Sequence, residues 1–280
     1  MAMKIITTTA TNQVNPTLLP IRQILTLLCF IGLARLLQAS AKDAAFDSLG
    51  RHPPSKCHPG TRRDILETIK RWITDTAEPG VFWLHGPAGA GKSAIAQTVC
   101  ELSAKRNHLL ASFFFMRGSP DRGTIKNFIP TLALQVCMSR TDLRQHVGNA
   151  IEADLTILNK STSLLKLIIE PLRSSTPSQS APFLVVIDGL DECDGKDHQL
   201  QILAHISELT TKYHLVRFLI TSRPEPHIRH FLNVFINQNS SIAFSIYGHR
   251  ADYGDVYKFL RSTFNEISTS ETCIIPCPYR

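Results

Sequence analysis

The chain has 280 residues, of which 43% are hydrophobic, and this is enough to bury the core of one α/β domain with extensions or of two small domains. The formal net charge is +7. Four of the cations lie in the first 42 residues, which contain no acid: Lys4, Arg22, Arg35 and Lys42. The rest of the chain is nearly balanced, so no nucleic-acid partner is expected, because a nucleic-acid footprint needs clustered positive charge.

The seven cysteines are scattered along the chain and include no C-x-x-C pair. An odd number without such spacing argues against a disulfide framework and is typical of reduced thiols, so a cytoplasmic location is expected. Cys57 and His58 are adjacent, but no other residue with metal-ligand spacing accompanies them. An ordinary loop pair is therefore the favoured interpretation of these two residues.

Residues 1–44 are interpreted as an N-terminal extension that contains one apolar helix. Residues 1–16 are rich in Thr and Asn and are expected to be disordered. The uncharged centre of the apolar segment, residues 24–34, is shorter than the roughly 20 residues that a membrane-spanning helix needs. A helix that packs on the domain or on a partner is therefore favoured over a membrane contact by this segment.

Targeting by residues 1–41 stays open as an alternative. The acid-free, Thr-containing composition resembles a mitochondrial presequence, and Ala39-Ser40-Ala41 resembles a secretory cleavage site. Arg35 interrupts the apolar segment, and a long region precedes Arg22, so a secretory signal fits the pattern less well. The sequence leaves the role of this segment undecided between packing, targeting and anchoring.

The most informative stretch is residues 81–93, which predicts a strand, a glycine-rich loop and the start of a helix. The loop fits G-x-x-x-x-G-K-[ST], the phosphate-binding P-loop. Its residues are Gly86, Pro87, Ala88, Gly89, Ala90, Gly91, Lys92 and Ser93. Glycines let backbone N–H groups turn toward phosphate oxygens, and the helix N-terminus adds unpaired donors and partial positive charge. Lys92 is expected to reach the β- and γ-phosphates, and the Ser93 hydroxyl to ligate Mg²⁺.

A helix is predicted directly before that strand. Thr61 is expected to be its N-cap, with Asp64 three residues later in a capping-box arrangement. The apolar residues that recur at helical spacing and should face the core are Ile65, Leu66, Ile69, Trp72 and Ile73. Trp83, in the strand that follows, is also interpreted as a core residue rather than a stacking platform.

Strands and helices alternate after the P-loop. Strands are predicted over residues 109–116, 183–187, 216–220 and 242–247. Helices are predicted over residues 124–154 with breaks at Pro130 and Ser139, and over 163–172, 198–213 and 253–267. This alternation indicates an α/β fold with a doubly wound, mainly parallel sheet flanked by helices.

A second part of the site is expected where another strand ends, because ligands of open α/β sheets bind outside the carboxyl ends of strands. Asp188 directly follows the strand over residues 183–187 and can hold Mg²⁺ opposite Ser93. Asp191 and Glu192 come next. Glu192 is predicted to be the general base that orients an attacking water, with Asp191 as the alternative.

Two arginines also follow predicted strands. Arg223 comes after the strand over residues 216–220, and its fixed positive charge could sense or stabilise a γ-phosphate. Arg117 ends the Phe-rich strand over residues 109–116. For Arg117 the favoured interpretation is an ordinary residue at the end of a strand.

Three motifs together resemble one family. G-P-A-G-A-G-K-S (residues 86–93), F-L-V-V-I-D-G-L-D-E (183–192) and F-L-I-T-S-R-P (218–224) are similar to the NACHT domains of the STAND class of signalling NTPases. The segment over residues 45–62 resembles NACHT proteins of mushroom-forming fungi and the nephrocystin-like N-terminal grouping. The resemblance implies a NACHT-type P-loop NTPase domain over residues 45–267, followed by an irregular tail over residues 268–280.

The resemblance implies a five-stranded sheet in which the strand ending at Arg223 lies between the P-loop strand and the Asp188 strand. It implies ATP, with GTP as the alternative, bound with Mg²⁺ and hydrolysed slowly, and homo-oligomerisation through the domain in signalling similar to fungal innate immunity. Asp191, Glu192 and Arg223 would serve hydrolysis, and Thr61 and Arg62 would lie near the adenine.

Family members normally continue into a winged-helix region and a repeat sensor, so this chain is expected to be a truncated signalling switch. Two other interpretations remain. A nucleotide-dependent scaffold without hydrolysis would use the same loop to bind partners. A small-molecule kinase would not need the Asp191–Glu192 pair, and the sequence contains no acceptor-site signature.

Overall fold

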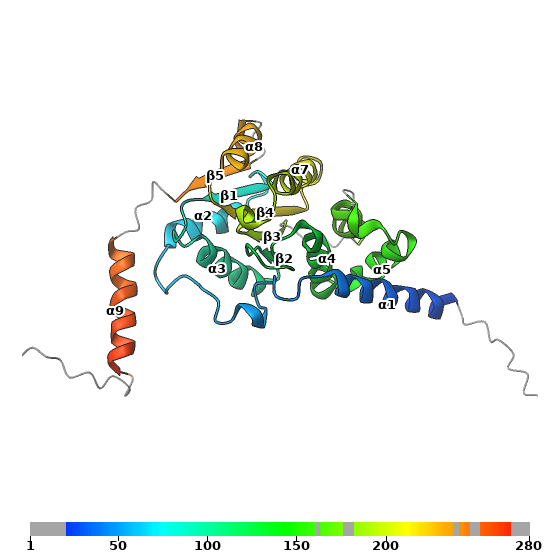
Figure 1. Ribbon diagram of the computed structural model, residues 1–280, viewed down its shortest axis with the longest axis horizontal. Coiled ribbons are helices and arrows are strands. Elements are labelled where there is room, and N and C mark those ends of the chain that lie inside the picture. The colour runs from blue at the N-terminus through cyan, green and yellow to red at the C-terminus, as the bar shows by residue number, and fades with distance from the viewer. Residues whose placement is uncertain (1–20, 161–162, 176–181, 238–240, 247–252, 270–280) are drawn as a thin grey trace, which may run out of the picture.

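A parallel sheet of five strands forms the centre of the molecule (Figure 1). The structure, a computed structural model, describes residues 21–160, 163–175, 182–237, 241–246 and 253–269. Along the sheet the strand order is β2-β3-β4-β1-β5, and every neighbouring pair is parallel. The strands are β1 (Val81–His85), β2 (Leu109–Phe114), β3 (Phe183–Asp188), β4 (Val216–Ser222) and β5 (Ser241–Ser245). β4 lies between β1 and β3, as the family resemblance implies.

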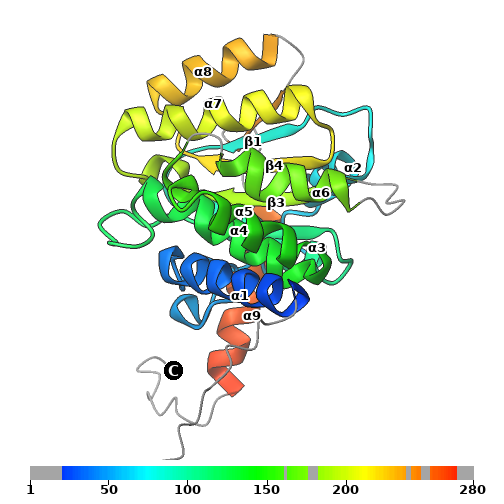
Figure 2. The ribbon, with the colours of Figure 1, turned by 90° about the vertical axis from the view of Figure 1, so that its right-hand side faces the viewer.

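Helices cover both faces of this sheet, which makes the fold doubly wound. The α-helices of the described residues are α1 (Ile21–Ala39), α2 (Arg63–Thr74), α3 (Lys92–Ala104), α4 (Phe128–Ser139), α5 (Arg144–Ala153), α6 (Glu170–Ser174), α7 (Lys196–Lys212), α8 (Pro226–Asn237) and α9 (Tyr253–Thr269). Of these, α9 lies apart from the sheet (Figure 1). In Figure 2, α7 and α8 lie above the strands, and α1 lies below α4. The predicted α/β class is therefore confirmed.

Side chains that alternate along each strand build a separate core on each face. Phe82 and Leu84 of β1 point into a core shared with α2 and α3. Val81 and Trp83 point into the opposite core, which contains residues of α4, α5, α7 and α8. This is the expected consequence of the two-residue period of a strand with both faces covered. The predicted burial of Trp72 and Trp83 is confirmed, with 2% and 1% of each residue exposed.

α1 packs against α5 and α4. Gly32 and Gly148 allow this close approach, since a Cβ atom built on Gly32 would lie 2.4 Å from the carbonyl oxygen of Gly148. Leu36 is fully buried in the core beneath α1. The helix packed on the domain is thus confirmed, while the disorder predicted for residues 1–16 lies outside the described residues. None of the helices in the described ranges combines the length and hydropathy that crossing a membrane requires.

The outer edge of β2 is closed by side-chain and loop contacts. The Gln135 amide of α4 accepts from the backbone N–H of Ser112 at 3.0 Å and donates to its carbonyl at 2.7 Å. The N–H of Phe114 donates to the Ala44 carbonyl at 2.9 Å. These contacts take the place of a further strand, which protects an otherwise open sheet edge and fixes the end of β2.

Two local predictions were wrong, and one helix was missed. α2 begins at Arg63 rather than after a Thr61 cap, because Arg62 occupies the cap position in a left-handed conformation (φ 55°) and the Thr61 hydroxyl donates to the carbonyl of His58. Pro130 does not break α4, since it lies in the first turn, where its missing N–H has no intrahelical role. α8 was not predicted at all, although Pro226 begins it for the same reason.

Candidate functional site

The P-loop connects β1 to α3 and curves around open space. Gly89 and Gly91 have φ of 74° and 87°, a region that favours glycine. A Cβ atom on Gly89 would meet nothing within 4 Å, and one on Gly91 would meet only the Arg62 Nη2 atom at 3.8 Å. α3 begins directly afterwards at Lys92, so its first N–H groups, which have no intrahelical partner, face this space. The cradle fits a phosphate group.

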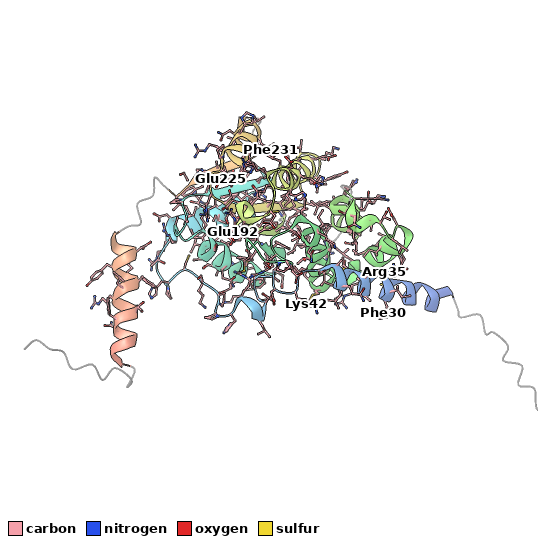
Figure 3. All side chains as sticks on the ribbon, in the orientation of Figure 1. Phe30, Arg35, Lys42, Glu192, Glu225 and Phe231 are labelled. Carbon is pink, nitrogen blue, oxygen red and sulfur yellow. The ribbon has the colours of Figure 1, made fainter. Side chains whose placement is uncertain are left out.

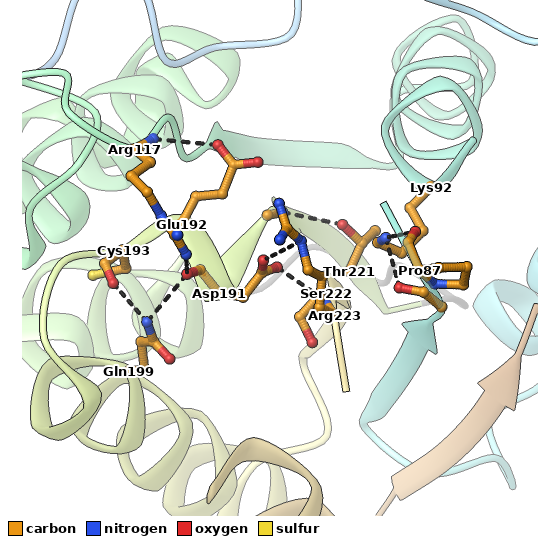
Figure 4. A network of polar contacts seen from close by, with 12 residues as sticks. Pro87, Lys92, Arg117, Asp191, Glu192, Cys193, Gln199, Thr221, Ser222 and Arg223 are labelled. Carbon is orange, nitrogen blue, oxygen red and sulfur yellow. Dashed lines mark hydrogen bonds and ion pairs between the residues drawn. The ribbon is translucent and has the colours of Figure 1, made fainter. Parts of the chain in front are cut away.

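Lys92 lies folded across the loop. Its Nζ atom donates to the carbonyl of Gly86 at 2.9 Å and to that of Pro87 at 2.8 Å (Figure 4). Burial lowers the pKa of Lys92, and the nearby carboxylates of Asp191 and Asp188 oppose that shift. The loop therefore holds a partly desolvated ammonium group close to the acids of the next strands.

Asp188 ends β3 and is 5% exposed. The Thr221 hydroxyl donates to its Oδ1 atom at 2.5 Å. Burial raises the pKa of Asp188, and the hydroxyl groups of Thr221 and Ser93 work in the opposite direction. Ser93 of the P-loop helix thus lies close enough to Asp188 to act on the pKa of its carboxyl group, and the two predicted Mg²⁺ ligands are neighbours.

This oxygen pair fits the chemistry of Mg²⁺. In the described part of the chain, no three His, Cys, Asp or Glu side chains gather into a cluster that could hold a metal ion alone. Mg²⁺ is commonly bound by one or two protein oxygens, together with waters and the phosphates of a nucleotide. Ser93 and Asp188 beside an open phosphate cradle match that ligand set.

The two acids that follow Asp188 point to opposite neighbours. Asp191 is 4% exposed and accepts from the backbone N–H of Arg223 at 2.9 Å, and its Oδ2 atom lies 3.2 Å from the Arg223 Nε atom. Glu192 turns toward the end of β2, where its Oε2 atom accepts from the backbone N–H of Arg117 at 3.2 Å (Figure 4). Asp191 and Glu192 are adjacent in the sequence, but in the fold each of them contacts a different arginine.

Further contacts hold the backbone of this acidic turn. The carbonyl of Asp191 accepts from the Arg117 Nη2 atom at 2.9 Å and from the Gln199 Nε2 atom at 3.3 Å. Gln199 also donates to the carbonyl of Cys193 at 2.6 Å, and its Oε1 atom lies 2.6 Å from the His227 Nε2 atom of α8. A buried hydrogen-bond network therefore connects α7 and α8 to the acids.

Sequence reasoning did not find Thr221, Gln199 or His227. Thr221 stands inside the T-S-R-P motif two residues before Arg223, and its place near the end of a strand was a usable signal. Gln199 and His227 lie on separate helices, and no spacing in the sequence links them to Asp191. Their role depends on the packing of α7 against α8.

Arg62 reaches the P-loop, whereas the Thr61 side chain does not contact it. The Arg62 Nη2 atom donates to the carbonyl of Ala90 at 3.0 Å, and its backbone N–H donates to Asp255 of α9 at 2.8 Å. Beside them lies a cavity of about 180 Å³. Its lining includes Gly60, Arg62, Ile65, Ile95, Phe244, Ile246, Asp255 and Lys258. The lining mixes four apolar side chains with five charged ones, since Arg63 and Asp64 also belong to it.

Other large features of the surface lie away from this edge. A cavity of about 940 Å³ opens between the end of α1, β2 and α4, and none of the predicted site residues lines it. In Figure 3, Glu192 lies near the centre of the sheet, whereas Phe30, Arg35 and Lys42 lie along the lower edge of the molecule. Arg35 and Lys42 therefore do not add to the charge of the site.

The motif order and this geometry can be compared with known proteins. The sequence model of the family described as nephrocystin 3, N-terminal, matches residues 60–223, which is more than half of the chain. The chain belongs to the nephrocystin 3 N-terminal family. The matched range runs from Gly60 to Arg223, so this family segment contains the P-loop, Asp188 and both acids of the turn. No curated protein matches the chain.

Three solved structures are similar to this family member at low identity. A STAND protein with a tetratricopeptide repeat sensor from Pyrococcus horikoshii is 16% identical (TM-score 0.44) over 75% of this chain and 26% of that one. A Walker-type ATPase of Pyrococcus abyssi is 14% identical (TM-score 0.42) over 80% and 62%. The ORC2 protein of Aeropyrum pernix, solved in ADPNP-ADP complexes, is 14% identical (TM-score 0.32) over 90% and 53%. The chain spans less than two thirds of each of these proteins.

Proposed function

We propose that this chain is a Mg-ATP-binding module of the STAND type, with a NACHT-type domain over residues 45–267 that hydrolyses ATP slowly. The observation that carries the proposal is that Ser93 of the P-loop helix lies beside the buried carboxyl group of Asp188, on whose pKa it acts. A P-loop alone supports only phosphate binding. Its hydroxyl group beside a carboxylate from another strand supplies the oxygen ligands that Mg²⁺ uses with nucleotide phosphates.

The phosphates would be bound by the backbone of residues 86–91, the N-terminus of α3 and Lys92. Lys92 now donates to two loop carbonyls, those of Gly86 and Pro87. Nucleotide binding would replace these with bonds to phosphate oxygens, in which the acceptor as well as the donor carries charge. Bound Mg²⁺ would neutralise charge on the β- and γ-phosphates.

Glu192 is the proposed general base, and Asp191 is proposed to hold the sensor. Asp191 is engaged by both the backbone and the side chain of Arg223, which supports Glu192 over Asp191 as the residue that orients water. The Arg223 side chain remains 44% exposed and keeps N–H groups for a γ-phosphate. Each of the three residues thereby receives a separate role.

ATP is the proposed nucleotide, with GTP as the alternative. The cavity of about 180 Å³ beside Arg62 is the proposed base site, because it lies next to the P-loop and its lining offers the apolar side chains of Ile95 and Phe244 together with charged groups. Homo-oligomerisation through the NACHT-type domain and a role in signalling similar to fungal innate immunity are proposed from the motif resemblance. The five described cysteines are free thiols, which supports the proposed cytoplasmic location.

The experiment that tests this function measures phosphate release and ATP affinity on the same protein preparation. The wild-type chain is expected to bind ATP and release phosphate slowly. Glu192→Gln should lower the rate of release about 100- to 10,000-fold, the usual contribution of a general base, and leave ATP affinity unchanged. Glu101→Gln, on the far part of α3, is the matched control and should release phosphate like the wild type.

A scaffold that binds nucleotide without hydrolysis is the alternative function. Absence of phosphate release from a folded, ATP-bound wild type would favour the scaffold and contradict the hydrolase. Equal release by the wild type and Glu192→Gln would contradict the role of Glu192 but not the binding site.

A further inference from the structure

We propose that Arg117 is a positioning residue that holds Glu192 and Asp191 apart, so that only Glu192 is available to act as a base. This inference rests on the proposed hydrolysis. Arg117 follows β2 and makes two contacts with the acidic turn: its backbone N–H donates to the Glu192 carboxylate, and its guanidinium donates to the Asp191 carbonyl. One residue thereby fixes the side chain of one acid and the backbone of the other.

The two arginines on either side of β3 form a matched arrangement. β2 and β4 are the neighbours of β3 in the sheet, and Arg117 and Arg223 follow these strands. The backbone N–H of Arg223 donates to the carboxylate of Asp191, and the Nε atom of Arg223 forms an ion pair with the same group. The backbone N–H of Arg117 donates to the carboxylate of Glu192. The acids are adjacent in sequence, yet each is directed toward a different neighbouring strand.

The turn that carries the acids needs this support. Residues Leu190–Glu192 form a single 3-10 turn, entered through Gly189 with φ of 69°. So short a turn has few internal hydrogen bonds to fix its rotation. A rotation would exchange the directions of Asp191 and Glu192. Bonds from Arg117 and Gln199 to the Asp191 carbonyl oppose that rotation from both sides.

Arg117 is not expected to contribute to nucleotide affinity. Its hydrogen bonds go to the acidic turn, and β3 and β4 separate the strand that it follows from β1 and the P-loop. Removing its side chain should therefore lower the turnover rate and leave the ATP dissociation constant unchanged. A displacement of a catalytic group by about 1 Å can cost about 100-fold in rate, and we expect a loss of about 10- to 100-fold for Arg117→Ala.

The test uses the full chain and four variants. Arg117→Ala should show the loss in turnover number with unchanged ATP affinity, and Arg117→Lys should recover part of the rate, because a lysine keeps a donor of the same charge. Arg122→Ala is the matched control on the same loop, since the Arg122 side chain contacts Met116 and the carbonyl of Asp43 but neither acid. The Arg122→Ala variant should hydrolyse ATP at the wild-type rate.

A double variant separates positioning from general damage. If Arg117 acts through Glu192, then adding Arg117→Ala to Glu192→Gln should change the residual rate by less than twofold, because interacting residues are not additive. If the double variant instead loses turnover by the product of the losses of the two single variants, the residues act independently and the proposal is wrong. So would wild-type turnover in Arg117→Ala. Neither result would affect the proposed hydrolysis, which fails separately if the wild type itself releases no phosphate.

Discussion

The two halves of the site are built in different ways. The phosphate half is one continuous stretch, residues 86–93, between a strand and a helix that are adjacent in sequence. The acid half combines the ends of β2, β3 and β4, and its contacts span up to 75 residues of chain, as between Arg117 and Glu192. A local motif specifies the first half. Only the order of strands in the sheet specifies the second.

This difference determines what each half contributes. The P-loop supplies backbone donors and a lysine, which suffice to hold phosphate. The acid half supplies the buried carboxylate and the separated pair of acids, and these are the groups that metal binding and hydrolysis require. Changes in the first half should therefore affect affinity, and changes in the second half should affect stability, metal dependence and rate.

The largest expected effect on ATP affinity is that of Lys92→Ala in the phosphate half. Loss of an ammonium group that is partly buried and aimed at phosphates should weaken ATP binding by about 100-fold or more, corresponding to about 2.7 kcal/mol. Titration with ATP checks this, and Lys105→Ala, at the other end of α3, serves as the control. Unchanged affinity of Lys92→Ala would contradict the P-loop assignment.

Thr221→Val tests the acid half through its stability. The hydroxyl of Thr221 donates to Asp188 and accepts from the N–H of Gly189 at 3.1 Å, and valine would leave both buried groups without this partner. We expect a loss of about 1–3 kcal/mol in the free energy of unfolding. Thr210→Val is the control, because Thr210 is equally buried but bonds only within α7. A larger loss in the control would contradict the importance of the Asp188 contact.

Asp188→Asn should change how stability depends on pH. Burial raises the folded-state pKa of Asp188 above its usual value of 3.8. A carboxyl group with a raised folded-state pKa stabilises the fold below the unfolded-state pKa, and this contribution disappears as the pH rises through the folded-state value. The wild type should therefore lose stability as the pH increases above about 4, and Asp188→Asn should lose less.

At pH 7 without nucleotide, Asp188→Asn is expected to melt about 2–4 °C higher than the wild type, the usual shift for 1 kcal/mol in a large domain. The same variant should gain no additional stability from Mg²⁺ in the presence of ATP. Melting curves over a range of pH, with and without Mg²⁺, measure both effects. A lower melting temperature at pH 7 would show that the charged form of Asp188 stabilises the fold.

The smallest expected effect is that of Arg62→Gln at the border of the two halves. This change removes the bond from the guanidinium to the carbonyl of Ala90. ATP affinity should fall by about two- to fivefold, as expected for one hydrogen bond of about 0.5–1 kcal/mol. Turnover of bound ATP should not change. A loss as large as that of Lys92→Ala would mean that Arg62 contacts phosphate directly.

The alternation of strands and helices was enough to predict the sheet, because strands buried on both faces appear as continuous apolar runs, such as the one over residues 183–187. The failures came from prolines and from distant contacts. Pro130 was treated as a break and the helix that Pro226 begins was missed, although each proline lies in the first turn of a helix. At the start of α2, the backbone N–H of the cap residue Arg62 donates to Asp255, which is 193 residues away.

In the site, the sequence supplied Ser93 and Asp188 because each belongs to a motif at the end of a strand, and the structure brings them together. It could not predict that Asp191 and Glu192 would face different strands, since adjacent positions in a sequence do not indicate direction within a short turn. Arg117 was interpreted as an ordinary residue at the end of a strand for the same reason. Its partners became visible only with the order of the sheet.

The central claim is that the two halves act together on Mg-ATP. The most direct test titrates the full wild-type chain with ATP in the presence and absence of Mg²⁺ and follows both binding and phosphate release in one sample. The account predicts saturable binding that Mg²⁺ strengthens, with slow release of phosphate only when Mg²⁺ is present. Binding of equal strength without Mg²⁺, or no binding at all, would contradict it.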